Sequence, residues 1–223
     1  MSKSKKKRSK LVETVSIPSV KLDLGCGQHP REGFEGVDLY ASVAKHKVDL
    51  FKFPWAFADN SVEEINASHL LEHIPAREVE LRDIVDGPRR DLKYLGADML
   101  FAFMDECWRI LKLDGWMHVV VPSGRSNRAF WDPTHRRFFM QETFLYFAHD
   151  WRKINGLDHY RVSCNFGVDT GHSLPQEEGL RSSDVQTQRF HTLWNVTIDW
   201  IAKLKKLPPP VVQALLPDAS VKS

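Results

Sequence analysis

Two histidines and a glutamate lie within the five residues 69–73, which read HLLEH. The spacing matches the H-x-x-E-H pattern of one class of zinc metalloenzymes. On a helix, His69, Glu72 and His73 would occupy positions i, i+3 and i+4, so their side chains would share one face. Three interpretations stay open at this point: a zinc hydrolase, another kind of metal site, or an amphipathic turn.

A second stretch with chemical meaning is the glycine-rich segment 22–40, which reads LDLGCGQHPREGFEGVDLY. Gly25 and Gly27 allow the backbone to pass close to a ligand. Asp38 ends a predicted strand, and its carboxylate can accept hydrogen bonds from both hydroxyls of a ribose. A dinucleotide site would favour a third glycine where this chain has Pro30. The segment therefore favours a nucleoside ligand without a pyrophosphate.

Apolar periodicity predicts the elements that must position these residues. Strands are expected at 19–24, 34–39, 47–51, 62–67, 116–121 and 194–200. Apolar residues recur every three or four positions over 97–112, which predicts the clearest helix, and Asp114-Gly115 is expected to end it as a turn. A second helix is expected at 140–148, and an exposed helix with a loop within 76–95.

Strands that alternate with helices predict an α/β fold with a mostly parallel sheet. In such sheets, ligands bind beyond the carboxyl ends of the strands. The polar residues that follow the predicted strands are expected to gather there. They are Asp23, Asp38, Asp49, Ser68 and His69.

The composition is typical of a globular protein in a reducing compartment. Of the 223 residues, 42% are hydrophobic and 27% are charged, as in ordinary soluble domains. The three cysteines are widely spaced and form no C-x-x-C pair, so neither a disulfide framework nor a cysteine zinc site is expected. No apolar run is long enough to span a bilayer. The basic N-terminal stretch is not followed by an apolar segment, so no signal peptide is expected. We therefore expect a cytoplasmic protein that does not enter a membrane.

One domain is expected over 16–207, between a disordered basic tail at 1–15 and a C-terminal tail at 208–223. Residues 1–10 hold six of the 31 Lys and Arg residues and none of the 29 acids, so the rest of the chain has four more acids than bases. The body is therefore not a basic nucleic-acid-binding domain. A solubilising role is favoured for the basic tail, and contact with nucleic acid through it stays open.

Several motifs in order give the chain a resemblance to a known family. LDLGCG, GVDLY, VDLFKFPWAFADNSVEEINASHLLEHI and ECWRILKLDGWMHVVVPS resemble the motifs of class I S-adenosylmethionine-dependent methyltransferases, over about residues 20–147. Small bacterial and phage members with a shortened first crossover are the most similar. The resemblance implies a Rossmann-like α/β fold, with a mostly parallel seven-stranded sheet and helices on both faces.

The resemblance also implies which residues bind S-adenosylmethionine. The expected set is Asp23, Gly25, Cys26, Gly27, Asp38, Leu39, Asp49, Leu50 and Ser68. The glycine loop would wrap the methionine end, and the acid before the loop would hold its amino group through water. The acid after the second strand would bind the ribose hydroxyls. The Asp-Leu pair after the third strand would border the adenine, and the serine after the fourth would line the sulfonium side.

A second likeness concerns the HLLEH segment. Small-RNA 2′-O-methyltransferases and ubiquinone-pathway O-methyltransferases carry E-x-x-E-H there and add a histidine from a loop after strand five, and together these residues hold a divalent metal. Glu72 and His73 match the end of that motif, and His135 is similar in position to the loop histidine. His69 replaces the first glutamate, which shifts the metal preference from Mg²⁺ toward Mn²⁺, Fe²⁺ or Zn²⁺. The implied ligands are thus His69, Glu72, His73 and His135.

Methyl transfer to a hydroxyl is the implied reaction, with His69, His73 and His135 as catalytic residues. N-methylation of a sugar or small amine stays open, as do a non-catalytic module that binds RNA or a partner and a pocket without metal. The chain lacks the Asn/Asp-Pro-Pro-aromatic motif of enzymes that N-methylate DNA bases, and it lacks the long helix of a zinc protease. Trp131 is expected to line the substrate pocket. The acceptor and the oligomeric state are not predicted.

Overall fold

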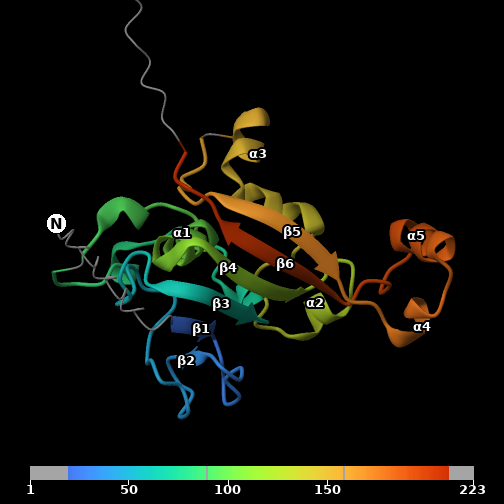
Figure 1. Cartoon of the computed structure of the whole chain (residues 1–223), viewed down its shortest axis with the longest axis horizontal. Coiled ribbons are helices and arrows are strands. Elements are labelled where there is room, and N and C mark those ends of the chain that lie inside the picture. Colours follow the sequence, from blue (N-terminus) through green and yellow to red (C-terminus); the bar gives the residue numbers. More distant parts are fainter. Residues whose placement is uncertain (1–19, 89, 158, 211–223) are drawn as a thin grey trace, which may run out of the picture.

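A six-stranded sheet forms the frame of the molecule in the computed structural model, which describes residues 20–88, 90–157 and 159–210 (Figure 1). The strands are β1 (Val20–Leu24), β2 (Glu35–Val37), β3 (Val62–Ser68), β4 (Leu111–Pro122), β5 (Phe166–His172) and β6 (Asp199–Lys206). Their order across the sheet is β2-β1-β3-β4-β6-β5. Apart from 208–210, the predicted tails at 1–15 and 208–223 lie outside the described residues.

The mostly parallel α/β sheet is confirmed, but with six strands instead of seven. β2, β1, β3 and β4 run parallel, whereas β6 is antiparallel to β4 and to β5. The predicted strand at 47–51 is wrong, because this segment turns. The Asp49 side chain accepts a hydrogen bond from the amide of Phe51 at 3.0 Å. Nearby, an isolated bridge joins Val37 to His46 at this edge.

The C-terminal strands differ most from the prediction. β6 begins at Asp199 instead of residue 194, and β5 has no counterpart in the sequence prediction. Asn195 has a left-handed φ of 61°, so the alternating residues before β6 form a loop. Within β6, Trp200, Ala202 and Leu204 are buried on one face. The apolar alternation continues into a lysine-rich segment, where the lysines mask it.

Helix α1 (Met99–Ile110) confirms the helix predicted at 97–112. The Asp98 side chain caps it by accepting a hydrogen bond from the amide of Leu100 at 2.9 Å. The predicted turn at Asp114-Gly115 is wrong, because β4 begins directly after the helix and contains these residues. Asp114 has a φ of 63°, and the register with β3 shifts beside it, so the pair forms a bulge.

The remaining helices are short. They are η1 (Leu71–His73), η2 (Leu81–Asp83), η3 (Leu92–Tyr94), α2 (Arg128–Trp131), η4 (Gln141–Phe147), α3 (His149–Ile154), α4 (Gln176–Gly179) and α5 (Ser183–Thr192). The helix predicted at 140–148 is the 3₁₀-helix η4, and two 3₁₀ turns replace the exposed helix expected within 76–95. Among the described residues, no helix is long and apolar enough to cross a membrane.

The two faces of the sheet differ in their covering. Alternate residues of β3 and β4, such as Ile65 and Val119, are fully buried in one core with the apolar residues of α1. On the opposite face Lys21 pairs with Glu64 at 2.7 Å, and Trp116 is exposed. The core therefore holds the sheet from one side, and the carboxyl ends of its parallel strands present the polar residues.

A buried carboxylate fixes α1 against the chain that precedes β3. Glu106 has no exposed surface, and it accepts hydrogen bonds from the amide of Trp55 at 2.6 Å and from the hydroxyl of Tyr94. The guanidinium of Arg109 donates to the same carboxylate at 2.8 Å and also pairs with Asp59. A buried charge is tolerated when it is both paired and hydrogen-bonded in this way.

We expect Glu106→Gln to lower the free energy of unfolding by about 3–5 kcal/mol, because it leaves the charge of Arg109 without its buried partner. Urea denaturation followed by circular dichroism measures the change. Glu63→Gln is the control, since Glu63 is exposed on β3, and it should change stability by about 0.5 kcal/mol or less. Equal effects of the two substitutions would show that the buried network does not stabilise the fold.

Candidate functional site

The candidate site begins in the glycine loop after β1. Gly25 and Gly27 have φ values of 66° and 54°, in the left-handed region that favours glycine. A Cβ atom on Gly25 would lie 2.8 Å from Cδ1 of Leu70, so Leu70 packs directly on this glycine. A Cβ atom on Gly27 would meet no described atom within 4 Å. The predicted close approach of backbone and ligand is therefore available at Gly27.

Asp38 connects the end of β2 to this loop. Its Oδ2 accepts a hydrogen bond from the amide of Gly27 at 3.2 Å, and its Oδ1 accepts from the amides of Tyr40 and Ala41, both at 2.8 Å. Partial burial acts to raise the pKa of Asp38, but these amides outweigh it and hold the pKa below its ordinary value. The carboxylate is thus fixed in its charged form, and Oδ2 keeps capacity to accept from a hydroxyl.

Asp23 is committed to the loop itself. The side chain is 5% exposed, and it accepts hydrogen bonds from the amide of Arg31 at 2.8 Å and from Nδ2 of Asn66 at 2.7 Å. Nη1 of Arg31 donates in turn to Oδ1 of Asn66 at 2.8 Å. Arg31 and Asn66 are absent from the sequence prediction. The register that places Asn66 opposite Asp23 across β1 and β3 is the signal that could have found it.

The other predicted cofactor residues have different environments. The thiol of Cys26 packs on β2, where a Cβ atom on Gly36 would lie 2.7 Å from the sulfur, and burial raises the pKa of that thiol. Leu50 is part of the hydrophobic core, whereas Leu39 and Ser68 are exposed. The contact of Leu50 with adenine stays a prediction, and its observed role is packing.

The HLLEH segment forms a turn, so the helical arrangement in which His69, Glu72 and His73 would share one face does not occur there. β3 continues to Ser68, His69 has a left-handed φ of 53°, and η1 is a single 3₁₀ turn. Nδ1 of His69 lies 3.3 Å from Oε1 of Glu72. This interaction with Glu72 raises the pKa of His69, against the opposing effect of burial. His69 therefore contacts Glu72 from beside the turn instead of sharing a helix face with it.

Three of the four predicted metal ligands come together. One ligand atom each from Glu72, His73 and His135 lies within 4.8 Å of the others, and His69 is not part of this group. The rings of His73 and His135 meet edge to face with centroids 4.8 Å apart. The sequence prediction of His135 beside His73 is thus matched in space, although 61 residues separate His73 from Thr134, the neighbour of His135.

The backbone of Glu72 brings His135 to this position. Its carbonyl accepts hydrogen bonds from the amides of Arg136 and Arg137 at 2.7 and 3.1 Å. The guanidinium of Arg137 donates to the carbonyl of Ile74 at 3.1 Å and to Oδ2 of Asp98 at 3.0 Å. Arg137 therefore joins the histidine loop, η1 and the cap of α1, a role that the sequence did not indicate.

The hydrogen bonds of His73 and His135 define their tautomers. Nδ1 of His135 lies 2.9 Å from the carbonyl oxygen of Ala129, which can only accept, so this nitrogen carries the proton. The Thr134 hydroxyl lies 2.6 Å from Oδ1 of Asp132 and 2.9 Å from Nδ1 of His73. The hydrogen bond from that hydroxyl holds the pKa of Asp132 below its ordinary value. The hydroxyl therefore donates to Asp132, and Nδ1–H of His73 donates to the hydroxyl oxygen. In its neutral form, each ring keeps an unprotonated Nε2.

This donor set fits a divalent transition metal. Oε2 of Glu72 is buried and has no hydrogen-bond partner in the part of the chain that the structure describes. Two imidazole nitrogens and one carboxylate oxygen suit Mn²⁺, Fe²⁺ or Zn²⁺ better than Mg²⁺. The Nδ1–H groups of His73 and His135 are held by outer oxygen atoms, which is how proteins orient metal-binding histidines.

Trp131, expected in the substrate pocket, is 74% exposed at the end of α2. Its neighbours divide between core and surface. Phe139, Phe144 and Phe147 are buried in the core, whereas Phe138 is half exposed. Most of the aromatic cluster at 130–147 thus packs inside the fold or against it, and a substrate contact of Trp131 stays a prediction.

Comparisons with known proteins address the fold. No family model and no curated protein match the sequence. An S-adenosylmethionine-dependent methyltransferase from Archaeoglobus fulgidus has 19% identity and a TM-score of 0.53, over 84% of this chain and 86% of that chain. Two methyltransferases of this type are more distant. The one from Mesorhizobium loti has 11% identity and a TM-score of 0.42, over 84% of this chain and 90% of that chain. The one from Methanosarcina mazei has 13% identity and a TM-score of 0.44, over 84% of this chain and 92% of that chain.

At such identities the likeness concerns the fold alone. The Archaeoglobus fulgidus structure has the highest TM-score of the three and supports the fold assignment. This likeness in fold agrees with the mostly parallel sheet described above. The chain therefore has the fold of the class I S-adenosylmethionine-dependent methyltransferases.

Proposed function

We propose that the protein is an S-adenosylmethionine-dependent methyltransferase that acts on a hydroxyl acceptor with the help of a divalent metal. One observation carries the proposal. Glu72, His73 and His135 converge directly after β3, next to Leu70, which packs on the glycine loop. In this kind of sheet, that edge is where ligands bind. S-adenosylmethionine would supply an electrophilic methyl group, which the acceptor oxygen takes as the carbon–sulfur bond breaks.

The residues of the glycine loop are proposed to hold the cofactor. Asp38 presents a charged carboxylate to the ribose, and Gly27 leaves its backbone open to the ligand. Asp23 acts by keeping the loop in place through Arg31 and Asn66. Rigid placement matters because methyl displacement needs the acceptor in line with the breaking bond.

Glu72, His73 and His135 are proposed to hold the metal through one carboxylate oxygen and the two Nε2 atoms. The metal would supply Lewis acidity that lowers the pKa of the acceptor hydroxyl. His69 is then the imidazole left to take the proton, because it touches Glu72 and its side chain is 41% exposed. The interaction with Glu72 raises the pKa of His69, which makes this imidazole a stronger proton acceptor.

The same site separates this proposal from two others. N-methylation of a small amine or sugar does not require a metal, because a neutral amine is already a nucleophile. A non-catalytic module would bind RNA, through the basic tail at 1–15, or a partner without turnover. Methyl transfer to hydroxyl acceptors that stops on chelation supports our proposal over both.

Asp38→Ala should weaken S-adenosylmethionine binding about tenfold or more, because it removes a charged acceptor from the ribose hydroxyls. Isothermal titration calorimetry measures the dissociation constant. Glu32→Ala removes an exposed carboxylate from the same loop and should leave the affinity unchanged. If the wild type does not bind, or if Asp38→Ala binds as tightly, the cofactor assignment fails.

His135→Ala should lose both the bound metal and the activity, because one of three ligands is removed. Elemental analysis after incubation with Mn²⁺, Fe²⁺ or Zn²⁺ and removal of the free ion measures occupancy near one per chain in the wild type. His69→Gln should keep the metal and lose activity, and His159→Ala, an exposed histidine outside the glycine loop and the metal group, should keep both. Full activity of metal-free protein would exclude the metal from the reaction.

The tautomers provide a test that needs no substrate. Long-range ¹H–¹⁵N correlation spectra of the metal-free protein at mildly alkaline pH should show Nδ1-protonated, neutral rings for His73 and His135. Thr134→Val should release His73 from this tautomer, while His135 serves as the internal control because Ala129 still holds it. An Nε2-protonated ring for both histidines in the wild type would contradict the arrangement of lone pairs.

A further inference from the structure

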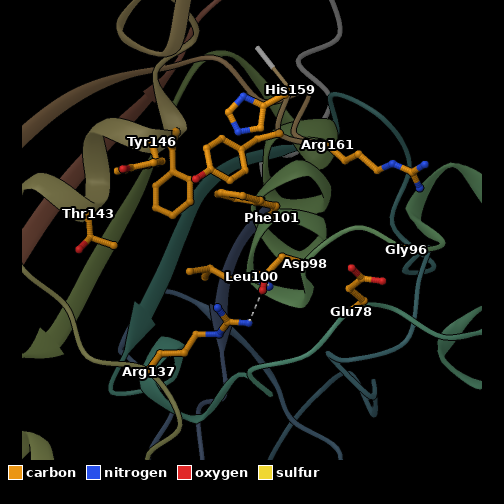
Figure 2. A pocket seen from close by; sticks show the side chains of 12 residues that line it. Glu78, Gly96, Asp98, Leu100, Phe101, Arg137, Thr143, Tyr146, His159 and Arg161 are labelled. Carbon is orange, nitrogen blue, oxygen red and sulfur yellow. Dashed lines mark hydrogen bonds and ion pairs between the residues drawn. The ribbon is translucent and has the colours of Figure 1, made fainter. Parts of the chain in front are cut away.

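A cavity of about 600 Å³ opens between the first turn of α1, η4 and the segment after α3 (Figure 2). This volume is ordinary for a small-molecule site. None of its lining residues belongs to the glycine loop or to the Glu72–His73–His135 group. Arg137 is at its boundary, so the cavity shares one wall with the network that positions His135.

One side of the cavity is aromatic. The ring of Tyr160 meets those of Phe101 and Tyr146 edge to face, with centroids 5.5 and 5.9 Å apart. Tyr160 is 38% exposed, and Phe101 is partly buried against the core, so the wall is firmly backed but accessible. Such rings offer apolar surface and edge-to-face geometry to a planar aromatic ligand.

The other side carries two unneutralised charges. Figure 2 shows Glu78 and Arg161 on the side of Gly96, away from Tyr146. Within the described ranges the carboxylate of Glu78 has no ion pair, and Arg161 donates to the carbonyl of Leu95 at 3.0 Å without an acidic partner. In contrast, the nearby charge of Arg137 is neutralised by Asp98 at 3.0 Å.

We propose that this cavity binds a free aromatic α-amino acid. The ligand ring lies against Phe101, Tyr146 and Tyr160, the ammonium faces Glu78 and the carboxylate faces Arg161. An apolar lining with a few converging polar groups is the usual form of a small-molecule site, and one free charge of each sign selects a zwitterion. This inference does not depend on the proposed methyl transfer, since its residues lie outside that site.

Calorimetry with the full-length protein and L-tryptophan, L-tyrosine and L-phenylalanine tests the proposal. At least one of the three should bind, and deleting either charge of the ligand should weaken binding about tenfold or more. For tryptophan, the matched compounds are tryptamine, which lacks the carboxylate, and indole-3-propionate, which lacks the ammonium. Tyrosine and phenylalanine have equivalent pairs in their amines and their 3-arylpropionates.

Two exposed substitutions assign each charge. Glu78→Gln should weaken binding of the amino acid but leave the affinity for the 3-arylpropionate unchanged, because that compound has no ammonium group to contact Glu78. Arg161→Gln should weaken binding of the amino acid but leave the affinity for the amine unchanged, because the amine has no carboxylate to contact Arg161. Arg82→Gln, an exposed arginine beyond the cavity, should alter none of these affinities.

Three results would overturn the proposal. The first is that none of the three amino acids binds at millimolar concentration. The second is that indole or phenol binds as tightly as the matching amino acid, which would mean that the charges contribute nothing. The third is competition by S-adenosylmethionine, itself an aromatic zwitterion, which would make the cavity part of the cofactor site.

Discussion

The carbonyl of Glu72 is the point on which the candidate site depends. It accepts hydrogen bonds from the amides of Arg136 and Arg137, and these bonds fix a loop after β4 onto the turn after β3. The Thr134 hydroxyl, 2.9 Å from Nδ1 of His73, is a further contact that holds the loop of His135 beside His73. Arg137 extends the constraint, because its guanidinium also reaches the carbonyl of Ile74 and the cap of α1. A planar guanidinium with several fixed donors can join three segments in one geometry, which a lysine cannot.

The glycine loop is also held in place by a small number of hydrogen bonds. No helix lies between β1 and β2, so the loop lacks the packing that a full crossover would supply. The network of Asp23, Asn66 and Arg31 takes that role with three hydrogen bonds of 2.7 to 2.8 Å. Asp38 then fixes the far end through the amide of Gly27. Polar contacts among buried or half-buried groups therefore replace a helix in positioning the loop.

The sequence predicted what local periodicity determines and missed what distant contacts determine. The helix at 97–112 and the strand at 62–67 follow from apolar spacing alone, and both are present. The segment 47–51 is apolar enough for a strand, yet Asp49 accepts from its own backbone and turns it. Of the helix and the turn that were both open for HLLEH, the turn is present, because His69 adopts a left-handed conformation that its residue type does not require. The geometry of the candidate site depends on Arg137 and Thr134, which the sequence did not indicate, and the roles of the predicted site residues stay predictions.

The geometry of Glu72 indicates what the site is built to hold. Its carbonyl is satisfied and its Oε1 contacts His69, but its buried Oε2 has no partner among the described residues, which costs about 1–3 kcal/mol. Neutral His73 and His135 cannot relieve this cost, because their protons are committed to Thr134 and Ala129. Where the two neutral histidines present Nε2 to Glu72, three electron-pair donors converge with no hydrogen between them. Such a group is mutually repulsive until a positive centre lies among its atoms, and in the proposed function a divalent metal ion would be that centre.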